Sequence, residues 1–275
     1  MAIPLNDFKY IADLVYKKSA IVLDTKKQYL VEARLASLIR LEGINDTSSL
    51  LGKLRAPSSE QLRAKVVDAM TTNETSFFRD NYPFEELRQK ILPTLIKNRE
   101  KEKKINIWCA ACSSGQEPYT IAMVLLTHFK QLFSNNWNIK IIASDISDKM
   151  LTTAKAGKYN QIEINRGLPS KMRERFFTQN DNTWTVNDEL RRSIEFKKIN
   201  LVERLVGLPR LDIIFMRNVL IYFDLDTKNA IFSKIENLMS PDSLLFIGST
   251  ETIIGITNNL ERYPASRSSL YQLKK

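Results

Sequence analysis

The feature that most constrains this chain is an alternation of short apolar runs and helical stretches that begins near residue 105. The apolar runs occupy 105–111, 139–145, 193–200, 211–218 and 243–249, and helices are predicted at 117–133, 147–156 and 226–239. Strands that alternate with helices form a parallel sheet covered by helices on both faces. A final run at 268–274 follows 243–249 without a clear helix between them, so we expect these last two strands to form an antiparallel edge.

The first 72 residues have a different pattern, because their apolar residues recur at helical spacing. The residues in this pattern are Phe8, Ile11, Leu14, Val15, Leu30, Leu35, Leu38, Ile39, Leu62, Val66, Val67 and Met70. We therefore predict an all-helical N-terminal domain over 1–72, a linker over 73–104 and a sheet domain over 105–275. Within the linker we expect one helical stretch at 84–92 and another from 93, before the charge run KNREKEKK. A chain of 275 residues is long enough for one large and one smaller domain.

Several classes of chemistry are excluded by what the sequence lacks. Its single histidine, His128, lies in a helical pattern far from any nucleophile motif, so neither a zinc site nor Ser-His-Asp catalysis is expected, and no metal is predicted. The sequence contains neither a P-loop nor a G-x-G-x-x-G fingerprint. Cys109 and Cys112 are too close together in the sequence to form a disulfide framework across the chain. A redox-active C-x-x-C is possible from the spacing, but small residues that line a turn are the better interpretation. With no signal peptide and no membrane-spanning run, we expect a soluble, cytoplasmic protein.

Informative residues gather at three predicted strand ends. The first strand ends in ACSSGQE, the second in Asp145, and another in Met216, Arg217 and Asn218. In an open α/β sheet, ligands bind at the carboxyl ends of the strands near the point where strand order reverses. A turn of small residues allows close backbone approach, and an acid ending the next strand can bind both ribose hydroxyls. The pattern favours a cofactor that carries a nucleoside, although an Asp in this place can also be a helix cap.

Glu117, beside the glycine turn, narrows the choice of cofactor. Its carboxylate would repel a pyrophosphate and attract a cationic group such as an ammonium. A ribose, no phosphate and a cationic amino-acid tail together describe S-adenosylmethionine. The alternative is that Glu117 only stabilises a helix start through the helix dipole.

Five segments then resemble those of the bacterial chemotaxis receptor methyltransferases, the CheR family. They are MTTNETSFFRD (70–80), WCAACSSGQEPYTIA (108–122), ASDIS (143–147), FMRNVLIYF (215–223) and GSTET (248–252). They occur in the family's order and span most of the chain. Two departures are visible: Gln116 stands where glutamate is common, and GSTET stands where Gly-x-Ser-Glu is common.

The resemblance implies a Rossmann-like class I S-adenosylmethionine-dependent methyltransferase sheet, an all-helical N-terminal domain and a small β subdomain inserted at about 176–196. It also implies the reaction, which is methyl transfer from S-adenosylmethionine to glutamate side chains in the cytoplasmic helical bundle of chemoreceptors, giving glutamyl methyl esters and S-adenosylhomocysteine. A glutamate with a pKa near 4.3 is already ionised at neutral pH, so its attack needs no general base. The scarcity of histidine is consistent with this chemistry.

The same resemblance implies roles for particular residues. Arg79 and Tyr222 would orient the substrate carboxylate as the catalytic pair. The cofactor-binding residues would be Asn73, Thr75, Arg79, Glu117, Asp145, Asn200, Leu201, Met216, Arg217 and Asn218. Each group has a plainer alternative: 75–80 could be a capped helix start, and the aromatic residues near Tyr222 could be core packing.

A net charge of +10 favours an acidic partner without choosing among partners. Lys27 and Arg34 share a face of a predicted helix at 27–40, with Arg40 nearby, and the resemblance makes this the surface that contacts acidic receptor helices. A solvated helix face is the alternative. We expect a monomer, no nucleic-acid partner and no membrane insertion.

Two other functions compete with this interpretation. One is an S-adenosylmethionine-dependent RNA methyltransferase, but the Asn/Asp-Pro-Pro-aromatic loop of base amino-group methylases is replaced here by RNVLIYF. The other is a non-catalytic adaptor. The sequence argues against an adaptor because it keeps Glu117, Asp145 and Arg79.

The hairpin region at 176–196 suggests how the receptor is found. Some family members grip a C-terminal receptor pentapeptide by adding it as a strand to the small β subdomain. Here the connection is short and lacks glycine. We therefore expect an enzyme that does not need the pentapeptide.

Overall fold

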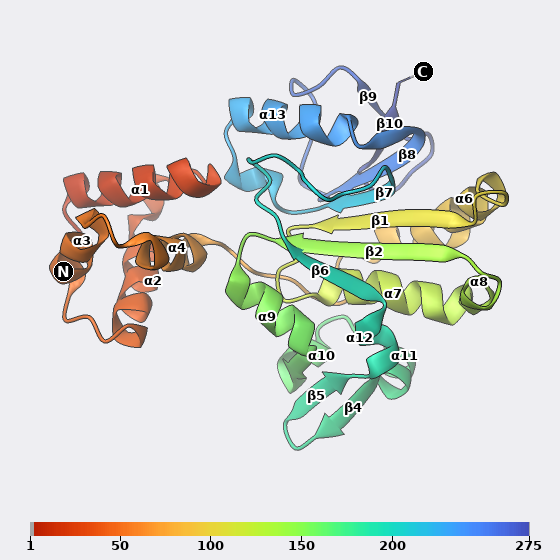
Figure 1. Ribbon diagram of the computed structural model, residues 1–275, viewed down its shortest axis with the longest axis horizontal. Coiled ribbons are helices and arrows are strands. Elements are labelled where there is room, and N and C mark those ends of the chain that lie inside the picture. The colour runs from red at the N-terminus through yellow and green to blue at the C-terminus, as the bar shows by residue number, and fades with distance from the viewer. Residues whose placement is uncertain (1–2, 275) are drawn as a thin grey trace. The chain divides into compact units, whose positions relative to one another are not determined.

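The computed structural model describes residues 3–274, and the chain divides into two compact units. The helical unit comprises the chain up to Thr72 together with Tyr222–Lys228. The sheet unit comprises Asn73–Ile221 and the chain from Asn229 onward. Figure 1 shows the elements of each unit with their labels.

The helical unit is built from four α-helices and one short 3₁₀ helix within the described residues. These are α1 (Leu5–Ser19), η1 (Thr25–Lys27), α2 (Gln28–Leu41), α3 (Thr47–Arg55) and α4 (Glu60–Met70). Their core holds most of the predicted positions, but Leu30 is 40% exposed and Val31 is buried in its place. Helical spacing fixes the width of an apolar face only to about one residue on either side, so this small rotation is not visible in the pattern.

The sheet unit contains a seven-stranded mixed sheet with strand order β6-β2-β1-β7-β8-β10-β9. The bounds are β1 (Lys104–Ala110), β2 (Asn138–Asp145), β6 (Ile194–Lys198), β7 (Leu211–Met216), β8 (Met239–Ile247), β9 (Leu260–Arg262) and β10 (Leu270–Leu273). β6, β2, β1, β7 and β8 pair in parallel, whereas β10 is antiparallel to both β8 and β9. The predicted parallel sheet with an antiparallel edge is confirmed, and β9 was not predicted because three residues show no periodicity.

Helices of this unit follow the strands as the alternation predicts. They are α7 (Gln116–His128), α8 (Lys130–Ser134), α9 (Asp148–Ala156), α12 (Asp188–Arg192) and α13 (Leu225–Glu236), whose first residues belong to the helical unit. Both α7 and α9 pack beside β2 and β6. α7 is buried along almost its whole length, and His128 is its last residue, as predicted.

The segment 73–104, predicted as a linker, is instead a packed part of the sheet unit. Its helices α5 (Tyr82–Glu86), the π-helical η2 (Leu87–Ile91) and α6 (Leu92–Asn98) run on from one another. Phe84, Leu87, Ile91, Leu92 and Leu95 are buried in the same core cluster as β1 and β7. Helical stretches were expected here from sequence, but their packing against the main sheet was not, because helical spacing does not show what an apolar face covers.

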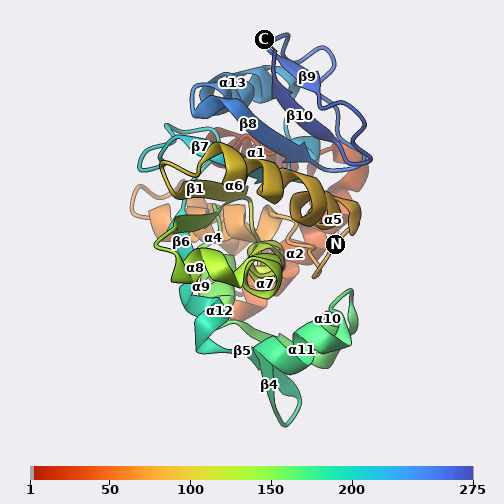
Figure 2. The same cartoon turned by 90° about the vertical axis from the view of Figure 1, so that its right-hand side faces the viewer.

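An insertion between α9 and β6 carries a second, three-stranded antiparallel sheet, ordered β3-β5-β4. Its strands are β3 (Lys158–Asn160), β4 (Phe177–Asn180) and β5 (Thr183–Val186), and it also contains α10 (Gln161–Asn165) and α11 (Ser170–Phe176). We call residues 158–186 the insertion. It starts earlier than the 176–196 expected from sequence, because β3 is too short to show a pattern. Figure 2 shows the insertion at the opposite end of the sheet unit from β8, β9 and β10.

Candidate active site

The strand order places the sequence-predicted residues at the carboxyl-terminal edge of the main sheet, where its parallel strands end. β1 lies between β2 and β7, and the chain leaves β1 toward β2 on one side while β7 lies on the other. Ala110 pairs with Ser144, and Cys109 pairs with Phe215. The carboxyl ends of β1, β2 and β7 therefore meet at the point where strand order reverses, which is where open α/β sheets bind ligands.

The turn after β1 is held in an unusual backbone conformation. Ala111 and Ser113 have φ of 54° and 51°, and Gly115 has φ of 95°. A Cβ on Gly115 would lie 2.9 Å from the Cβ of Ala154 on α9. Gly115 is therefore required by its own dihedral angle and by the close packing of α9. From sequence, the small residues of this turn were explained by close approach of a ligand.

Asp145 ties this turn to β2. One of its carboxylate oxygens accepts the Ser113 N–H at 2.8 Å, and the other accepts the Ser147 N–H at 2.9 Å. Ser147, not Asp145, caps α9, because its Oγ accepts the Met150 N–H at 3.0 Å. A carboxylate offers about four acceptor positions, which is more than these two backbone amides use.

Glu117 belongs to an ionic cluster around the buried Arg217 that sequence reasoning did not predict. The Arg217 side chain is 1% exposed; its Nη1 donates to Glu117 at 2.8 Å and its Nη2 to Asp80 at 2.5 Å. Arg217 Nη2 also donates to the backbone carbonyl of Arg79 at 3.1 Å. Two carboxylates share one guanidinium, so the Asp80, Glu117 and Arg217 cluster stays net negative and suits a cationic group. Glu117 also lies in the first turn of α7, which is the position that the alternative interpretation, stabilisation of the helix start, requires.

The two cysteines lie at this edge as free, buried thiols. Cys109 Sγ donates to Glu117 at 2.8 Å. Burial, with the Glu117 charge, raises the pKa of Cys109 well above its ordinary value, and burial raises that of Cys112 as well. A protonated, buried thiol is a poor nucleophile, so the redox interpretation of the C-x-x-C spacing is not supported.

The segment that precedes α5 lies against the same turn. The backbone carbonyl of Asn73 accepts from Ser113 Oγ at 2.7 Å, and Arg79 Nη1 donates to the carbonyl of Glu74 at 3.0 Å. Thr75 and Arg79 are both half-buried. The structure thus forms two hydrogen-bonded groups: Asn73 and Asp145 both bind Ser113, and Arg79 and Glu117 both bind Arg217.

Other predicted residues follow β6 and β7. Asn200 donates from Nδ2 to Glu203 at 3.1 Å, and Leu201 is buried. Met216 is fully buried, and Asn218, with φ of 59°, is half-buried. These residues lie at the same strand ends, but the buried Arg217 side chain is occupied by the acidic cluster.

Glu251 has a structural role in the site. In the sequence it was recognised only as part of the GSTET motif. Its carboxylate accepts backbone N–H groups of Gly248, Asn218 and Leu220 at 2.6, 2.8 and 2.7 Å. It therefore fixes the loop after β7 against the end of β8. No sequence pattern marks a carboxylate whose partners are backbone amides far along the chain.

Tyr222 and the three basic residues belong to the helical unit. Tyr222 ends the 3₁₀ helix η3 (Leu220–Tyr222), and its carbonyl accepts the Val22 N–H at 2.9 Å, so it is not part of the set gathered by β1, β2 and β7. Lys27 and Arg40 are exposed. Arg34 is half-buried and donates to the Met70 carbonyl at 2.6 Å and to Thr72 Oγ1 at 2.8 Å, so part of its role is to hold the end of α4.

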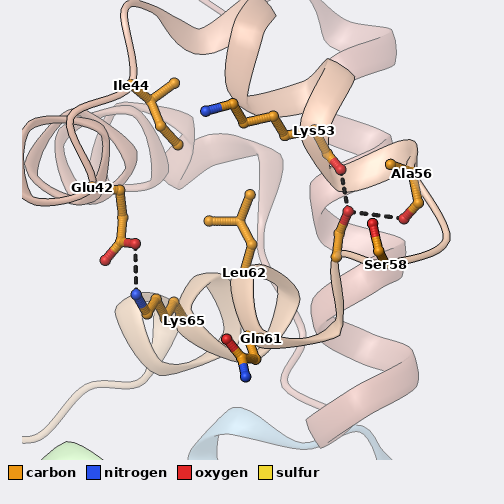
Figure 3. Close-up of a pocket in the computed structure, with 9 residues that line it drawn as sticks. Glu42, Ile44, Lys53, Ala56, Ser58, Gln61, Leu62 and Lys65 are labelled. Atoms are coloured by element: carbon orange, nitrogen blue, oxygen red, sulfur yellow. Dashed lines mark hydrogen bonds and ion pairs between the residues drawn. The ribbon is translucent and has the colours of Figure 1, made fainter.

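A pocket of about 370 Å³ lies within the helical unit (Figure 3). Lys65 closes one side through its ion pair with Glu42 at 2.6 Å, while Ile44 and Leu62 line the middle. This pocket contains none of the residues predicted to bind a cofactor or a receptor. Among residues 3–274, no helix is both long enough and apolar enough to cross a bilayer.

The fold and this edge define the class of protein. A doubly wound sheet with an acid ending β2, a net negative cluster beside the glycine turn and no phosphate-binding motif is an S-adenosylmethionine-dependent methyltransferase. Family models agree: "CheR methyltransferase, SAM binding domain" matches residues 73–268, and "CheR methyltransferase, all-alpha domain" matches residues 6–71. The chain belongs to the CheR methyltransferase family.

Named relatives cover the chain from end to end. The chemotaxis protein methyltransferase Cher2 of Pseudomonas putida is 38% identical over 273 residues, which is 98% of both chains. Chemotaxis protein methyltransferase 1 of Pseudomonas aeruginosa is also 38% identical over 273 residues, with 98% of both chains covered. The chemotaxis protein methyltransferase of Vibrio anguillarum is 37% identical over 276 residues, or 99% of both chains. The predicted family and cofactor class are confirmed.

Proposed function

We propose that this protein methylates glutamate side chains in the cytoplasmic helical bundle of chemoreceptors and so forms glutamyl methyl esters. The observation that carries the proposal is the net negative Asp80, Glu117 and Arg217 cluster after β1 and β7, together with Asp145 at the end of β2. In a chain that belongs to this family, these groups suit the ammonium and the ribose of S-adenosylmethionine. The relatives' names add the chemotaxis context.

The residues that bind the cofactor divide by chemistry. Glu117 would bind the ammonium, since Arg217 cancels only one of the two carboxylate charges of the cluster. Asp145 would accept from the ribose hydroxyls while it keeps its two backbone amides. Asn73, Thr75, Asn200, Leu201, Met216 and Asn218 would line the remainder of the site.

The bound cofactor supplies an electrophilic methyl group on a sulfonium. A substrate carboxylate is already anionic at neutral pH, so no residue of this chain has to take a proton. What the protein must do is place the carboxylate oxygen in line with the methyl carbon and the sulfur, and positioning of this kind can lower a barrier by roughly 7–11 kcal/mol. Arg79 would orient the carboxylate by a charge-assisted hydrogen bond. The new oxygen–carbon bond forms as the carbon–sulfur bond breaks, and the electron pair stays on sulfur.

The test uses the full chain, S-adenosylmethionine labelled on its methyl group, and a receptor cytoplasmic fragment. Label should enter the fragment and leave it as methanol in mild alkali, because esters hydrolyse there. Label that enters the fragment but resists alkali would indicate lysine methylation, and label in added RNA alone would favour an RNA methyltransferase. Cofactor binding with no transfer to any substrate would favour an adaptor.

A cytoplasmic location, a monomeric state and independence from the receptor pentapeptide belong to this proposal. The structural support for the last is that β4 and β5 are joined by only Asp181 and Asn182. A hairpin this tight lacks the loop expected to support an added strand.

A further inference from the structure

The insertion contacts two separate parts of the candidate active site. Phe77, which is fully buried, lies two residues before Arg79, and its ring meets Tyr159 of β3 and Phe177 of β4 edge-on at centroid distances of 5.1 and 5.5 Å. The Tyr159 hydroxyl donates to the Ser114 carbonyl of the turn after β1 at 2.7 Å. The small sheet therefore touches both the turn and the segment that carries Arg79.

The 166–167 loop of the insertion also contacts the segment that carries Arg79. Gly167 has φ of 91°, and a Cβ at this position would lie 2.2 Å from the backbone oxygen of Phe77, so only glycine fits. Its neighbour Arg166 forms an ion pair with Glu74. Glu74 in turn accepts from Arg79 through its backbone carbonyl at 3.0 Å.

The backbone of the segment needs such support. Phe78, Asp80 and Asn81 have φ of 50°, 66° and 49°, which side-chain-bearing residues rarely adopt. Conformations of this kind persist only where the surroundings fix them. On the sheet side, Arg217 binds the Arg79 carbonyl and Asp80, and on the other side the contacts come from the insertion.

We propose that Arg166 and Gly167 are positioning residues that set the placement of Arg79, so that the insertion controls turnover as well as any contact it makes with a receptor. The inference rests on the proposed function, since it uses the role of Arg79 given there. It assigns the 166–167 loop a part in the reaction although neither residue reaches the cofactor edge of the main sheet.

If Arg166 and Glu74 had a purely structural role, replacing them would lower the melting temperature together with turnover. The side chains of Arg166 and Glu74 are 57% and 58% exposed, and ion pairs this exposed contribute little to folding stability. Replacing either should leave the melting temperature almost unchanged. A loss of turnover in such a variant would therefore report placement of the segment and not loss of fold.

The experiment compares Arg166→Gln, Glu74→Gln and the charge swap Arg166→Glu with Glu74→Arg. Arg192→Gln is the matched control, because Arg192 is 80% exposed and forms its ion pair with Asp188 of the same helix, α12. At saturating receptor fragment, each single variant should lower kcat about three- to tenfold while the cofactor Kd stays within about twofold, and the swap should restore at least half of the lost turnover. The control should match the wild type.

Gly167→Ala should have a larger effect, because the added Cβ displaces the Phe77 backbone. If Gly167→Ala does not fold, the ion-pair variants still decide the question. Wild-type kcat in both single variants, or a swap no better than either single variant, would overturn the proposal.

Hydrogen exchange of the amides at 73–81 separates this proposal from the proposed function, since it needs no substrate. Arg166→Gln should raise exchange there, with Arg192→Gln unchanged. If the wild type transfers no methyl group, the proposed function fails while the exchange result still tests the placement. Unchanged exchange in Arg166→Gln would contradict the placement itself.

Discussion

The carboxylate of Asp145 binds two backbone amides, so its removal should weaken both the turn and the cofactor site. We predict that Asp145→Ala weakens S-adenosylmethionine binding by about 1.5–3 kcal/mol, because charge-assisted hydrogen bonds to the ribose are lost. Calorimetric titration measures this directly. Ser147→Ala is the control, since it removes only the cap of α9, at about 1 kcal/mol of stability, and should leave affinity intact. Unchanged affinity in Asp145→Ala would contradict the ribose assignment.

Arg79 is half-buried, and its guanidinium contacts the Glu74 carbonyl. If its role is to orient and screen the substrate carboxylate, Arg79→Ala should reduce kcat at least about tenfold more than it reduces cofactor affinity. Steady-state kinetics with parallel calorimetry give the two numbers. Equal losses in both would show that Arg79 is a cofactor ligand only.

The position of a side chain was predictable where it ends a strand, as Asp145 does, or lies soon after the following turn, as Glu117 does. A side chain's contacts were not predictable where the partner lies far along the chain. Arg217 was expected to line the cofactor site, yet its guanidinium contacts Asp80 and Glu117, 137 and 100 residues away. Glu251 likewise binds backbone amides 31 and 33 residues away, and no local pattern marks such contacts.

At the scale of elements, an ionic cluster fastens the end of α6 to the start of two strands. Arg99 donates from Nε to Asp212 on β7 at 3.1 Å and from both Nη atoms to Asp242 on β8 at 2.8 and 2.6 Å. Asp212 is 8% exposed and also accepts the Asn106 N–H at 2.7 Å. Removing Arg99 would leave Asp212 buried without its cation.

We predict that Arg99→Met lowers the free energy of unfolding at pH 7 by about 1–3 kcal/mol, with the part due to the half-exposed Asp242 discounted for screening. Hydrogen bonding to Arg99 holds the pKa of Asp242 below its ordinary value of 3.8. This stabilisation is therefore present above pH 3.8 and is lost as pH falls through the lower folded pKa. Urea unfolding should show that the difference in free energy of unfolding between wild type and variant narrows below about pH 4.

The control is Lys140→Met, which breaks an exposed pair with Glu195 and should change the free energy of unfolding little. A gap that is independent of pH would contradict the assignment to Asp242.

The hairpin of the insertion carries the prediction on receptor tethering. Because β4 and β5 are joined by only Asp181 and Asn182, we expect no measurable heat when a free receptor C-terminal pentapeptide is titrated into the protein. Micromolar binding would show that the edge of this small sheet is open to an added strand after all.

Elements were predictable when they were long and periodic, as β1, β2, β7 and α7 are. The three-residue strands β3 and β9 were not, because they are shorter than one clear alternation. The helices within 73–104 were expected, but their packing into the core of the sheet unit was not, because helical spacing does not show which surface an apolar face covers.

At the scale of the whole molecule, a net charge of +10 favours acidic partners, and the helical unit offers exposed cations for them. We predict that Lys27→Glu with Arg40→Glu slows receptor methylation roughly tenfold at low salt, with a smaller loss at high salt and no change in cofactor affinity. Arg34 is a less clean probe, because it also holds the end of α4. Lys53→Glu, an exposed lysine of α3 that lines the pocket of Figure 3, is the matched control. Equal slowing in the control would point to overall charge and not to this surface.

The central claim is that the acceptor atom is a glutamate carboxylate oxygen of a receptor. Tandem mass spectrometry of a receptor cytoplasmic fragment, after incubation with the full chain and S-adenosylmethionine, locates the methyl group at a single side chain. We predict methyl groups on glutamate carboxylates that disappear after mild alkali and are absent when Glu117→Gln replaces the wild type. Methyl groups on lysine or arginine, or an unmodified fragment despite measured cofactor binding, would contradict it.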